Sequence, residues 1–477
     1  MPSAQSLRTA DIGSGTLSVD EVLAWRPDPP WGGHGGAMAA ARRAAAATGC
    51  AVPGQQFGER WPVGCVALEI TQRCNLDCTL CYLSEHAEAV HDPPLEVIFR
   101  RIDWIRQHYG PGIDVQVTGG DPTLRRRDEL IAIVRRLAER SLRGTLMTNG
   151  IRADRALLAE LAEAGLQDVA FHVDTTQERP GYSSEATLNA LRESYIERAR
   201  GLGLSIMFNT TVHGGNLHEV SELARFFAAH ADVVRTASFQ LHADTGRGTT
   251  RARPDTVSLE GVWARVEAGA GTPLVHDAIR IGHPRCSRYG LALLAGGRAY
   301  DAFADRAFVA RLQAATAGIR LDRRRPGRTA RTFLAWLLGD PRWALECARH
   351  AGAALWRMRG SLAEGRGRMH TISFIVHDFM HACALERERV EACVFKVMTE
   401  KGPISMCVHN AKRDDYVLAP VPLADGSFFE PLSGARTTRA VHFAPPDPAS
   451  HGLKRARGRT RSRLLAARSA KRGEWVR

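Results

Sequence analysis

The chain of 477 residues carries a formal net charge of +13, with 44% hydrophobic and 24% charged residues. These proportions and this length are typical of a globular protein with a large core and two or three domains. The sequence contains no run of about 18 apolar residues, so we expect no transmembrane helix. The length, the ten cysteines and the lack of an expected signal peptide argue against a small secreted disulfide scaffold. They favour a reducing, cytoplasmic setting.

Both ends of the chain are expected to be irregular. Residues 1–60 are rich in Gly, Ala and Pro and predict a flexible extension with one short helix at 38–48. Residues 436–477 predict a disordered basic tail, because 454–477 hold ten Lys or Arg against one Glu, a net charge of +9. The rest of the chain is only mildly basic, so we expect no nucleic-acid cleft, although the tail could contact RNA, DNA or anionic lipid.

Between these ends, residues 61–285 contain strand-like segments that alternate with helical patterns. Strands are expected at 66–71, 113–118, 144–148, 168–174, 205–212 and 236–242. Helices are expected at 94–109, 127–142, 154–165, 185–203 and 216–230. This alternation favours parallel β/α units and an α/β fold. Six such units suit a partial (β/α)6 barrel, which places its chemistry at the C-terminal ends of the strands.

Three cysteines follow the first predicted strand with C-x3-C-x2-C spacing, at Cys74, Cys78 and Cys81. Three thiolates can ligate three irons of a [4Fe–4S] cube, which normally takes four cysteines, and so leave one iron open for chemistry. A structural zinc site usually has two paired ligand sets, whereas this triplet is the one closely spaced cysteine group. The spacing therefore favours a cluster, with zinc as the alternative.

Two turns follow the second and third predicted strands, at Gly119-Gly120-Asp121-Pro122 and Thr148-Asn149-Gly150. Glycine lets a backbone approach a ligand closely, although both runs also make ordinary turns. Because both stand at strand ends of the predicted barrel, on the same edge as the cysteines, we expect them to line the same site.

With Tyr82 directly after the last cysteine, these elements resemble the radical S-adenosylmethionine (SAM) superfamily. The resemblance implies that the triplet holds the catalytic cluster, that Tyr82 lies beside the adenine, and that the backbone of Gly119–Pro122 meets the SAM amino group with Asn149 nearby. Asp121 stands where the family usually has Glu. The family's reaction is reductive cleavage of SAM to a 5′-deoxyadenosyl radical, which takes hydrogen from an unactivated carbon and needs an electron donor such as flavodoxin or ferredoxin.

Polar residues near the ends of the later strands extend this candidate site. Asp174 ends the fourth strand with His172 two residues before it, Asn209 lies in the fifth strand and Gln240 in the sixth. These side chains are candidates for binding the SAM ribose and carboxylate, or the substrate. For each of them a structural hydrogen bond is the alternative.

Four cysteines beyond the barrel are enough for a second, auxiliary [4Fe–4S] cluster. They are Cys286, Cys383, Cys393 and Cys407. The first opens a helical connecting region at 286–370, and the others lie in an auxiliary region at 371–435. Buried structural cysteines are the alternative, and this is the role expected for Cys50, Cys65 and Cys347.

The motifs around these later cysteines resemble one branch of the superfamily, the archaeal tetraether lipid synthases and the related pterin methyltransferase. The motifs are His283-Pro284-x-Cys286, Phe379-Met380, Arg389-x3-Cys393 and Cys407-x-x-Asn410. His381 stands where the branch usually has Asp, Met406 replaces a Phe, and residues 1–60 lack the Cys-rich segments of the larger relatives.

The branch resemblance implies C–C bond formation or alkylation of a lipid or pterin-like substrate. A radical SAM enzyme that modifies a peptide is the alternative. A non-catalytic metal-binding or nucleic-acid-binding protein is the second alternative, and it requires the turns after the second and third strands to be coincidental.

Basic residues alternate with Trp and Leu at 323–358, from Arg323-Arg324-Arg325 to Trp356. This composition suits a helix that lies at a membrane surface, which would fit a lipid substrate. An ordinary amphipathic helix packed on the barrel is the alternative.

Overall fold

The computed structural model describes residues 15–28, 63–246, 257–317 and 326–445, together with the single residues 43 and 319. Apart from Arg43, the helix predicted at 38–48 lies outside the described residues. So do Cys50, the three arginines at 323–325, and residues 446–477 of the predicted basic tail.

Six parallel strands form the centre of the fold, and the predicted α/β class is confirmed. They are β1 (Cys65–Thr71), β2 (Asp114–Gly119), β3 (Arg143–Thr148), β4 (Asp168–His172), β5 (Ser205–Val212) and β6 (Val234–Leu241). Each begins and ends within two residues of its predicted bounds, because the runs of β-branched and apolar residues are short and bounded by turns.

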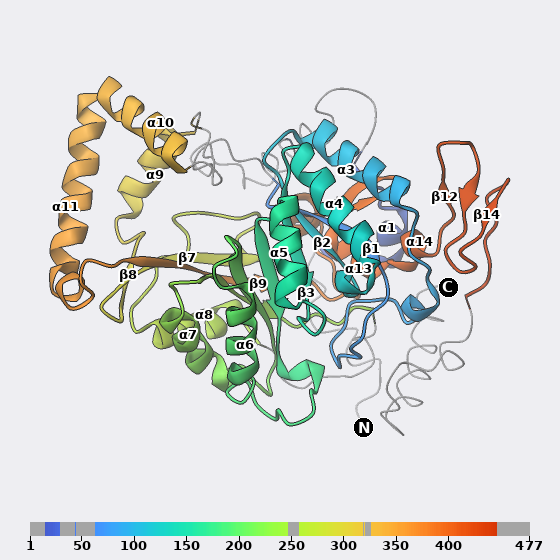
Figure 1. Cartoon of the computed structure of the whole chain (residues 1–477), viewed down its shortest axis with the longest axis horizontal. Helices are drawn as coiled ribbons and strands as arrows, with labels where there is room; N and C mark the ends of the chain where they lie inside the picture. Colours follow the sequence, from blue (N-terminus) through green and yellow to red (C-terminus); the bar gives the residue numbers. More distant parts are fainter. Residues whose placement is uncertain are drawn as a thin grey trace.

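Helices connect these strands and cover the outer face of the sheet (Figure 1). They are α3 (Leu95–Tyr109), α4 (Arg127–Glu139), α5 (Arg155–Ala164), α6 (Asn189–Ala199), α7 (Val220–Ala229) and α8 (Leu259–Ala270). The bounds of α5 follow from local chemistry. Asp154 caps its first turn by accepting a hydrogen bond from the Leu157 amide, and Gly165 ends it with a φ of +107°.

The C-terminal half of the chain completes the same sheet at both edges. Within the described residues the strand order is β11-β10-β1-β2-β3-β4-β5-β6-β9-β7-β8. The added strands are β7 (Ser287–Ala295), β8 (Arg298–Asp301), β9 (His370–Asp378), β10 (Phe395–Thr399) and β11 (Gly402–Ser405). Because β9 pairs with β6 and β10 pairs with β1, the edge amides and carbonyls of the six-stranded core find partners. The predicted connecting and auxiliary regions thus each contribute strands.

The side chains of β1 alternate between two faces of the sheet. Val66, Leu68 and Ile70 join the main hydrophobic core under the helices, whereas Cys65, Ala67 and Glu69 line an internal cavity. This follows from the pleat, which turns successive side chains to opposite sides. The core therefore lies between sheet and helices, and the concave side of the sheet remains available for a site.

The remaining elements lie around this barrel. They are α1 (Val19–Ala24), α9 (Arg306–Ala315), α10 (Pro326–Gly339), α11 (Pro341–Glu364), α12 (Arg387–Glu391), α13 (Met406–Ala411), α14 (Asp414–Val417), β12 (Val421–Pro422), β13 (Phe428–Phe429) and β14 (Arg436–Thr437). Helices α9 to α11 extend away from the barrel at one end of the molecule, and the small sheet β12–β14 lies at the other (Figure 1). No described helix is long and apolar enough to span a membrane.

Candidate active site at the carboxyl ends of the parallel strands

A cavity of about 1810 Å³ lies inside the curved sheet and collects most of the predicted site residues. They are Cys74, Cys78, Cys81, Tyr82, Gly119, Gly120, Asp121, Asn149 and Asn209, joined by His172 and Gln240. Pro122 and Asp174 are buried and are not among the lining residues. Pockets of about 300 to 1,000 Å³ commonly hold one small ligand, so this cavity has room for a cofactor and a substrate together.

The turn after β2 lies directly against the cysteine loop. The Gly120 amide donates to the Thr71 carbonyl at 2.9 Å, and the Asp121 amide donates to the Arg73 carbonyl at 2.8 Å. A Cβ on Gly119 or Gly120 would lie 1.9 Å from one of these carbonyl oxygens, and Gly119 also has a φ of +120°. Both glycines are therefore required for the close approach of two backbone segments.

Asp121 joins the turn after β2 to the turn after β3. Its side chain is 1% exposed and accepts hydrogen bonds from the Thr123 amide at 3.0 Å, the Thr148 hydroxyl at 3.0 Å and the Asn149 amide at 2.9 Å. The carboxylate thus holds Asn149 at the cavity wall. Asn149 in turn donates to Asn75 Oδ1 at 2.6 Å, which connects it to the cysteine loop.

The three cysteines of the triplet line one cavity, but their thiols are not close enough together to bind one metal ion. Burial raises the pKa of the Cys78 thiol well above its ordinary value, and the neighbouring Cys81 adds to the shift. Across the part of the chain that the structure describes, no three His, Cys, Asp or Glu side chains gather closely enough for a single metal ion. In a cube each thiolate binds a different iron, so separated thiols on one wall fit a [4Fe–4S] group.

Tyr82 is held by residues far away in the sequence. Its hydroxyl donates to the Gly119 carbonyl at 2.8 Å, and the guanidinium carbon of Arg413 lies 4.7 Å from its ring centroid. Arg413 donates to Glu69 Oε1 at 2.6 Å, and Gln72 donates to the other oxygen of Glu69 at 2.9 Å. The sequence analysis missed Glu69 and Arg413. A charged residue inside the apolar strand 66–71 was the available signal for Glu69.

Replacement of Glu69 by Gln is expected to make the free energy of unfolding less dependent on pH in the acid range. Burial alone would raise the pKa of Glu69, but Arg413 lowers it from 4.5 to about 2. A depressed pKa in the folded state contributes stability above pH 4.5 that is lost as the pH falls toward 2. This contribution is about 3 kcal/mol in full, and about 2 kcal/mol of it disappears between about pH 6 and pH 3.

Urea titrations of the cluster-free protein at several pH values measure this difference. The wild type should lose more stability than Glu69→Gln over the same interval. Parallel profiles for the two proteins would contradict the assigned ion pair. Exchange of Glu197, an exposed carboxylate on α6 paired with Arg200, for Gln provides the matched surface control.

His172, rather than Asp174, presents a polar group to the cavity from the end of β4. Asp174 is fully buried and accepts hydrogen bonds from His172 Nε2 at 2.7 Å, the Thr176 amide at 3.0 Å and the Thr211 amide at 2.8 Å. Although burial opposes ionisation, His172 and these donors hold the pKa of Asp174 well below its ordinary value. Asn209 Nδ2 lies 3.1 Å from His172 Nδ1 and 3.3 Å from Gln240 Oε1. Polar side chains of the neighbouring strands β4, β5 and β6 therefore form one row.

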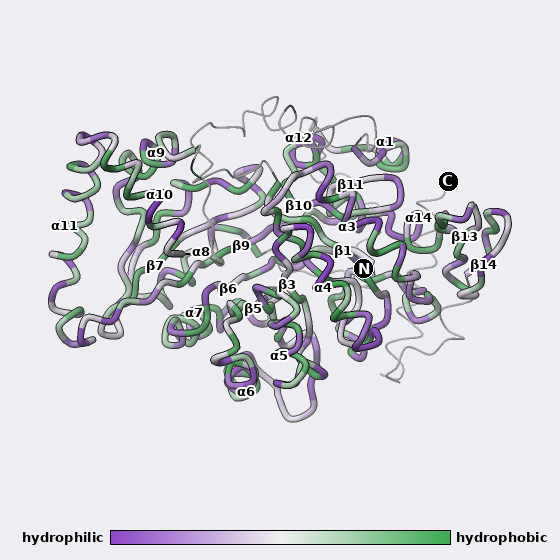
Figure 2. Tube along the Cα trace, turned by 45° about the horizontal axis from the view of Figure 1, so that its top comes forward, coloured by the Kyte–Doolittle hydropathy of each residue, from purple (hydrophilic) through white to green (hydrophobic). Residues whose placement is uncertain are grey.

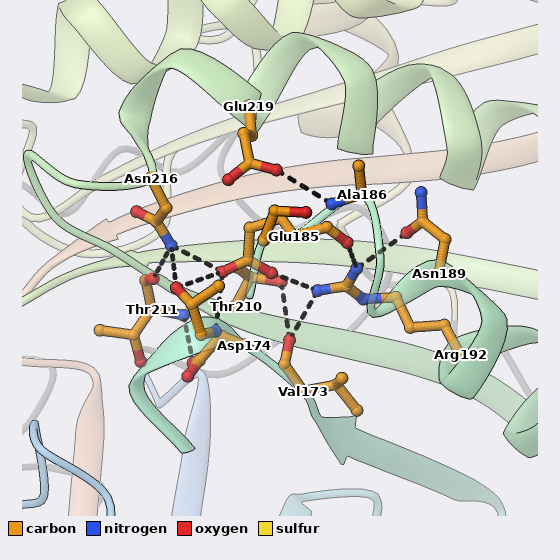
Figure 3. A network of polar contacts seen from close by, with 12 residues as sticks. Val173, Asp174, Glu185, Ala186, Asn189, Arg192, Thr210, Thr211, Asn216 and Glu219 are labelled. Atoms are coloured by element: carbon orange, nitrogen blue, oxygen red, sulfur yellow. Dashed lines mark hydrogen bonds and ion pairs between the residues drawn. The ribbon is translucent and has the colours of Figure 1, made fainter. Parts of the chain in front are cut away.

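A buried network of polar contacts connects Asp174 and Thr211 to Glu185 and Arg192 (Figure 3). Glu185 and Arg192, both with fully buried side chains, form an ion pair. Glu185 also accepts from the Thr175 amide at 2.9 Å and from Asn216 Nδ2 at 2.8 Å. Asn216 donates to the Thr211 carbonyl at 2.9 Å, and the Thr211 amide binds Asp174. The network therefore fixes the backbone that presents His172 and Asn209.

The structure brings three of the four later cysteines into one area. Cys286 Sγ accepts from Arg389 Nε at 3.3 Å, and Cys393 Sγ donates to the Phe395 carbonyl at 3.1 Å. Burial raises the pKa of Cys286 to about 11 and that of Cys407 well above its ordinary value, and the nearby Cys393 adds to both shifts. Cys383 is exposed. Cys65, expected to be structural, is buried with Cys393 among its neighbours.

Comparison with known proteins identifies the class of domain. Residues 68–227, which include the cysteine loop and strands β2 to β5, match the model of the Radical SAM superfamily. The chain therefore contains a radical SAM domain, the class predicted from the cysteine triplet. Domains of this class use a [4Fe–4S] cluster and SAM, and the donor set at the cavity wall fits both.

Particular curated relatives match part of the chain. A 7,8-dihydro-6-hydroxymethylpterin dimethyltransferase of Methanocaldococcus jannaschii is 32% identical over 186 residues, which are 38% of this chain and 36% of that protein. A PqqA peptide cyclase of Methylorubrum populi is 31% identical over 170 residues, 33% of this chain and 41% of that protein. The matched segment thus spans well under half of each curated relative.

Solved structures with a similar arrangement include Streptococcus suis SuiB bound to its precursor peptide SuiA. That chain is 16% identical to this one, with a TM-score of 0.34, and the match covers 43% of this chain and 45% of SuiB. The SAM-bound form of SuiB matches at 16% identity and a TM-score of 0.33, over 42% of this chain and 46% of that one.

Proposed function

We propose that this protein is a radical SAM enzyme that abstracts hydrogen from an unactivated carbon, for C–C bond formation or alkylation of a pterin-like or lipid substrate. The observation that carries this assignment is the shared cavity, which the three cysteines of the triplet line together with the glycine turn and the polar residues of the later strands. When bound, a [4Fe–4S] cluster with an open iron supplies the electron that splits the sulfonium bond of SAM into methionine and a 5′-deoxyadenosyl radical. The electron comes from an external donor of the flavodoxin or ferredoxin class.

The residues of the chain bind and orient the cofactor. The backbone of Gly119 to Pro122 would meet the SAM amino group, because its glycines allow a close approach. Asn149, positioned by Asp121, and Asn209, positioned beside His172, offer amide groups to the ribose and carboxylate. Tyr82 would lie beside the adenine, while Asp174 orients His172 through their hydrogen bond.

A group of aromatic side chains in the cavity supports a planar substrate. His377, Phe379 and Phe395 all line the cavity, with ring centroids 4.9 Å apart for His377 and Phe395 and 5.8 Å apart for the two Phe rings. Burial lowers the pKa of His377 to about 4, so its ring is neutral at pH 7. Aromatic walls of this kind stack on flat rings. A peptide substrate is the second candidate, because a PqqA peptide cyclase is among the relatives that match part of this chain.

Anaerobically reconstituted protein tests the assignment when it is incubated with SAM, dithionite and either 7,8-dihydro-6-hydroxymethylpterin or a synthetic peptide. We expect 5′-deoxyadenosine together with a mass increase of the pterin. Absence of 5′-deoxyadenosine under all conditions would refute the enzyme assignment. Formation of 5′-deoxyadenosine with a modified peptide and an unmodified pterin would favour the second candidate.

We further propose an auxiliary [4Fe–4S] cluster at Cys286, Cys393 and Cys407, with Cys383 as the fourth ligand. The expected iron content is about eight per chain, falling to about four in a Cys407→Ala variant that keeps the triplet. Iron analysis and the visible absorption spectrum measure this directly. An iron content near four in the wild type would show that these cysteines hold no cube, and an unchanged content in Cys383→Ala would remove that residue from the ligand set.

A further inference from the structure

The two helices α10 and α11, called here the helical arm (residues 326–364), carry an unusual share of exposed apolar side chains. Of the ten large hydrophobic residues exposed in the described part of the chain, five belong to the arm. They are Leu334, Leu338, Leu345, Leu355 and Trp356, which are between 52% and 75% exposed. The arm also lies at the extreme end of the molecule, away from the barrel (Figures 1 and 2).

The inner face of the arm already provides its attachment to the fold. Trp343 and Cys347 pack against Phe308 and its buried neighbours, and the His350 ring stacks on Phe308 with centroids 4.0 Å apart. The Ser361 hydroxyl lies 2.8 Å from that of Tyr300, which closes the base of α11. Because these contacts anchor the arm, the exposed side chains on the other face are not needed for packing.

The exposed face of α11 combines apolar and cationic side chains. Leu345, Arg349, Gly352, Trp356 and Arg359 recur at intervals of three and four residues and so share one stripe. The guanidinium carbon of Arg359 lies 4.2 Å from the Trp356 ring centroid.

The acidic residues of the arm are mostly turned away from this stripe. Glu346 pairs with Arg311 of α9, and Asp340 caps the start of α11 by accepting from the Arg342 amide at 3.1 Å. Glu364 stands at the far end of the helix. The stripe is therefore both apolar and positively charged.

We propose that this stripe docks the protein onto a bilayer that carries anionic headgroups. An amphipathic helix with Leu and Trp on one side inserts shallowly into the interface, and arginines at the same level bind lipid phosphates in a bidentate way. A second copy of the chain on the same face is disfavoured, because a two-fold contact would bring arginines toward arginines. This surface is remote from the cavity and is independent of the reaction assigned above.

Vesicle co-sedimentation of the full-length protein tests the docking surface. Vesicles contain phosphatidylcholine alone or mixed with phosphatidylglycerol. We expect binding to the mixed vesicles, weaker binding at high salt, and little binding to phosphatidylcholine alone. Leu345→Glu with Trp356→Glu should weaken binding at least about tenfold, and Arg349→Glu about fivefold or more. Ile151→Glu, at another exposed apolar residue outside the arm, is the matched control and should bind as the wild type does.

Other outcomes identify a different role for the surface. The basic segment 454–477 is present in every variant. Equal vesicle binding by all variants would therefore assign membrane binding to that segment and contradict the proposed role of the arm. Absence of wild-type binding would overturn the proposal directly. A dimer in sedimentation velocity that Trp356→Glu dissociates would make a second copy the occupant. Unchanged circular dichroism and thermal melting of the variants exclude unfolding as the cause of lost binding.

Discussion

Replacement of Cys78 by alanine is expected to abolish the formation of 5′-deoxyadenosine from SAM and dithionite. Cys78 lies between the other two cysteines of the triplet in the chain, is half-buried near Cys81, and lines the cavity of the radical SAM domain. If Cys78 is a cluster ligand as proposed, its removal should lower activity by more than about a hundredfold, because changes even to outer-shell partners of metal sites reduce affinity or activity by about 10- to 100-fold. Chromatography of the quenched reaction measures the product.

The matched control for this variant is Cys347→Ala. Cys347 lies on the inner face of α11, where it packs against Phe308 and its buried neighbours, and it is not among the residues that line the cavity. We expect this control to retain both 5′-deoxyadenosine formation and iron content. If Cys78→Ala and the control produced equal amounts of 5′-deoxyadenosine, the triplet would not be the catalytic cluster site, and the proposed function would fail with it.

Replacement of Glu185 by leucine is expected to lower the free energy of unfolding by about 3 to 5 kcal/mol. The substitution leaves the Arg192 guanidinium buried without its carboxylate, and burial already lowers the pKa of Arg192 below its ordinary value. It also removes the acceptor for the Thr175 amide and for Asn216. Urea denaturation followed by circular dichroism measures the loss.

A double substitution separates the ion pair from simple loss of packing. With both Glu185 and Arg192 changed to leucine, no unpaired charge remains, so the double variant should be less destabilised than the sum of the two single variants. Glu160→Ala removes an exposed partner of Arg127 and should leave stability almost unchanged. If the loss of stability in the double variant equalled the sum of the losses in the two single variants, Glu185 and Arg192 would not be a coupled pair.

Local sequence was sufficient to predict the α/β class and the triplet. Each strand from β1 to β6 is a short run of β-branched and apolar residues, and α3, α4, α5 and α7 each have an apolar stripe, so hydrophobic periodicity predicts these elements. Helix α6 is the exception, because its buried face includes Arg192. The chemistry of Cys74, Cys78 and Cys81 depends on spacing within one loop. The roles of individual polar residues were harder to predict, because a carboxylate such as Asp174 can either line a cavity or accept hydrogen bonds from its neighbours.

Long-range pairing accounts for the features that were missed. Glu69 meets Arg413 across 344 residues, and Cys286 meets Arg389 across 103. Neither contact has a signature in the local pattern, since it depends on β10 joining β1 and β9 joining β6. Composition likewise did not decide between the two interpretations of segment 323–358, whereas the structure shows one face of α11 packed on α9 and the other exposed.

The amino-acid sequence by itself determined the radical SAM class, the order of the strands and helices along the barrel, and the residues of the cysteine loop and glycine turn. These depend on spacing and periodicity within a few consecutive residues. Only the tertiary structure decided that His172 rather than Asp174 faces the cavity, that Asp121 positions Asn149, and that an outer apolar stripe lies opposite the packed face of α11. The physical reason is that side-chain direction and burial are set by which strands and helices meet, and those meetings join residues far apart in the chain.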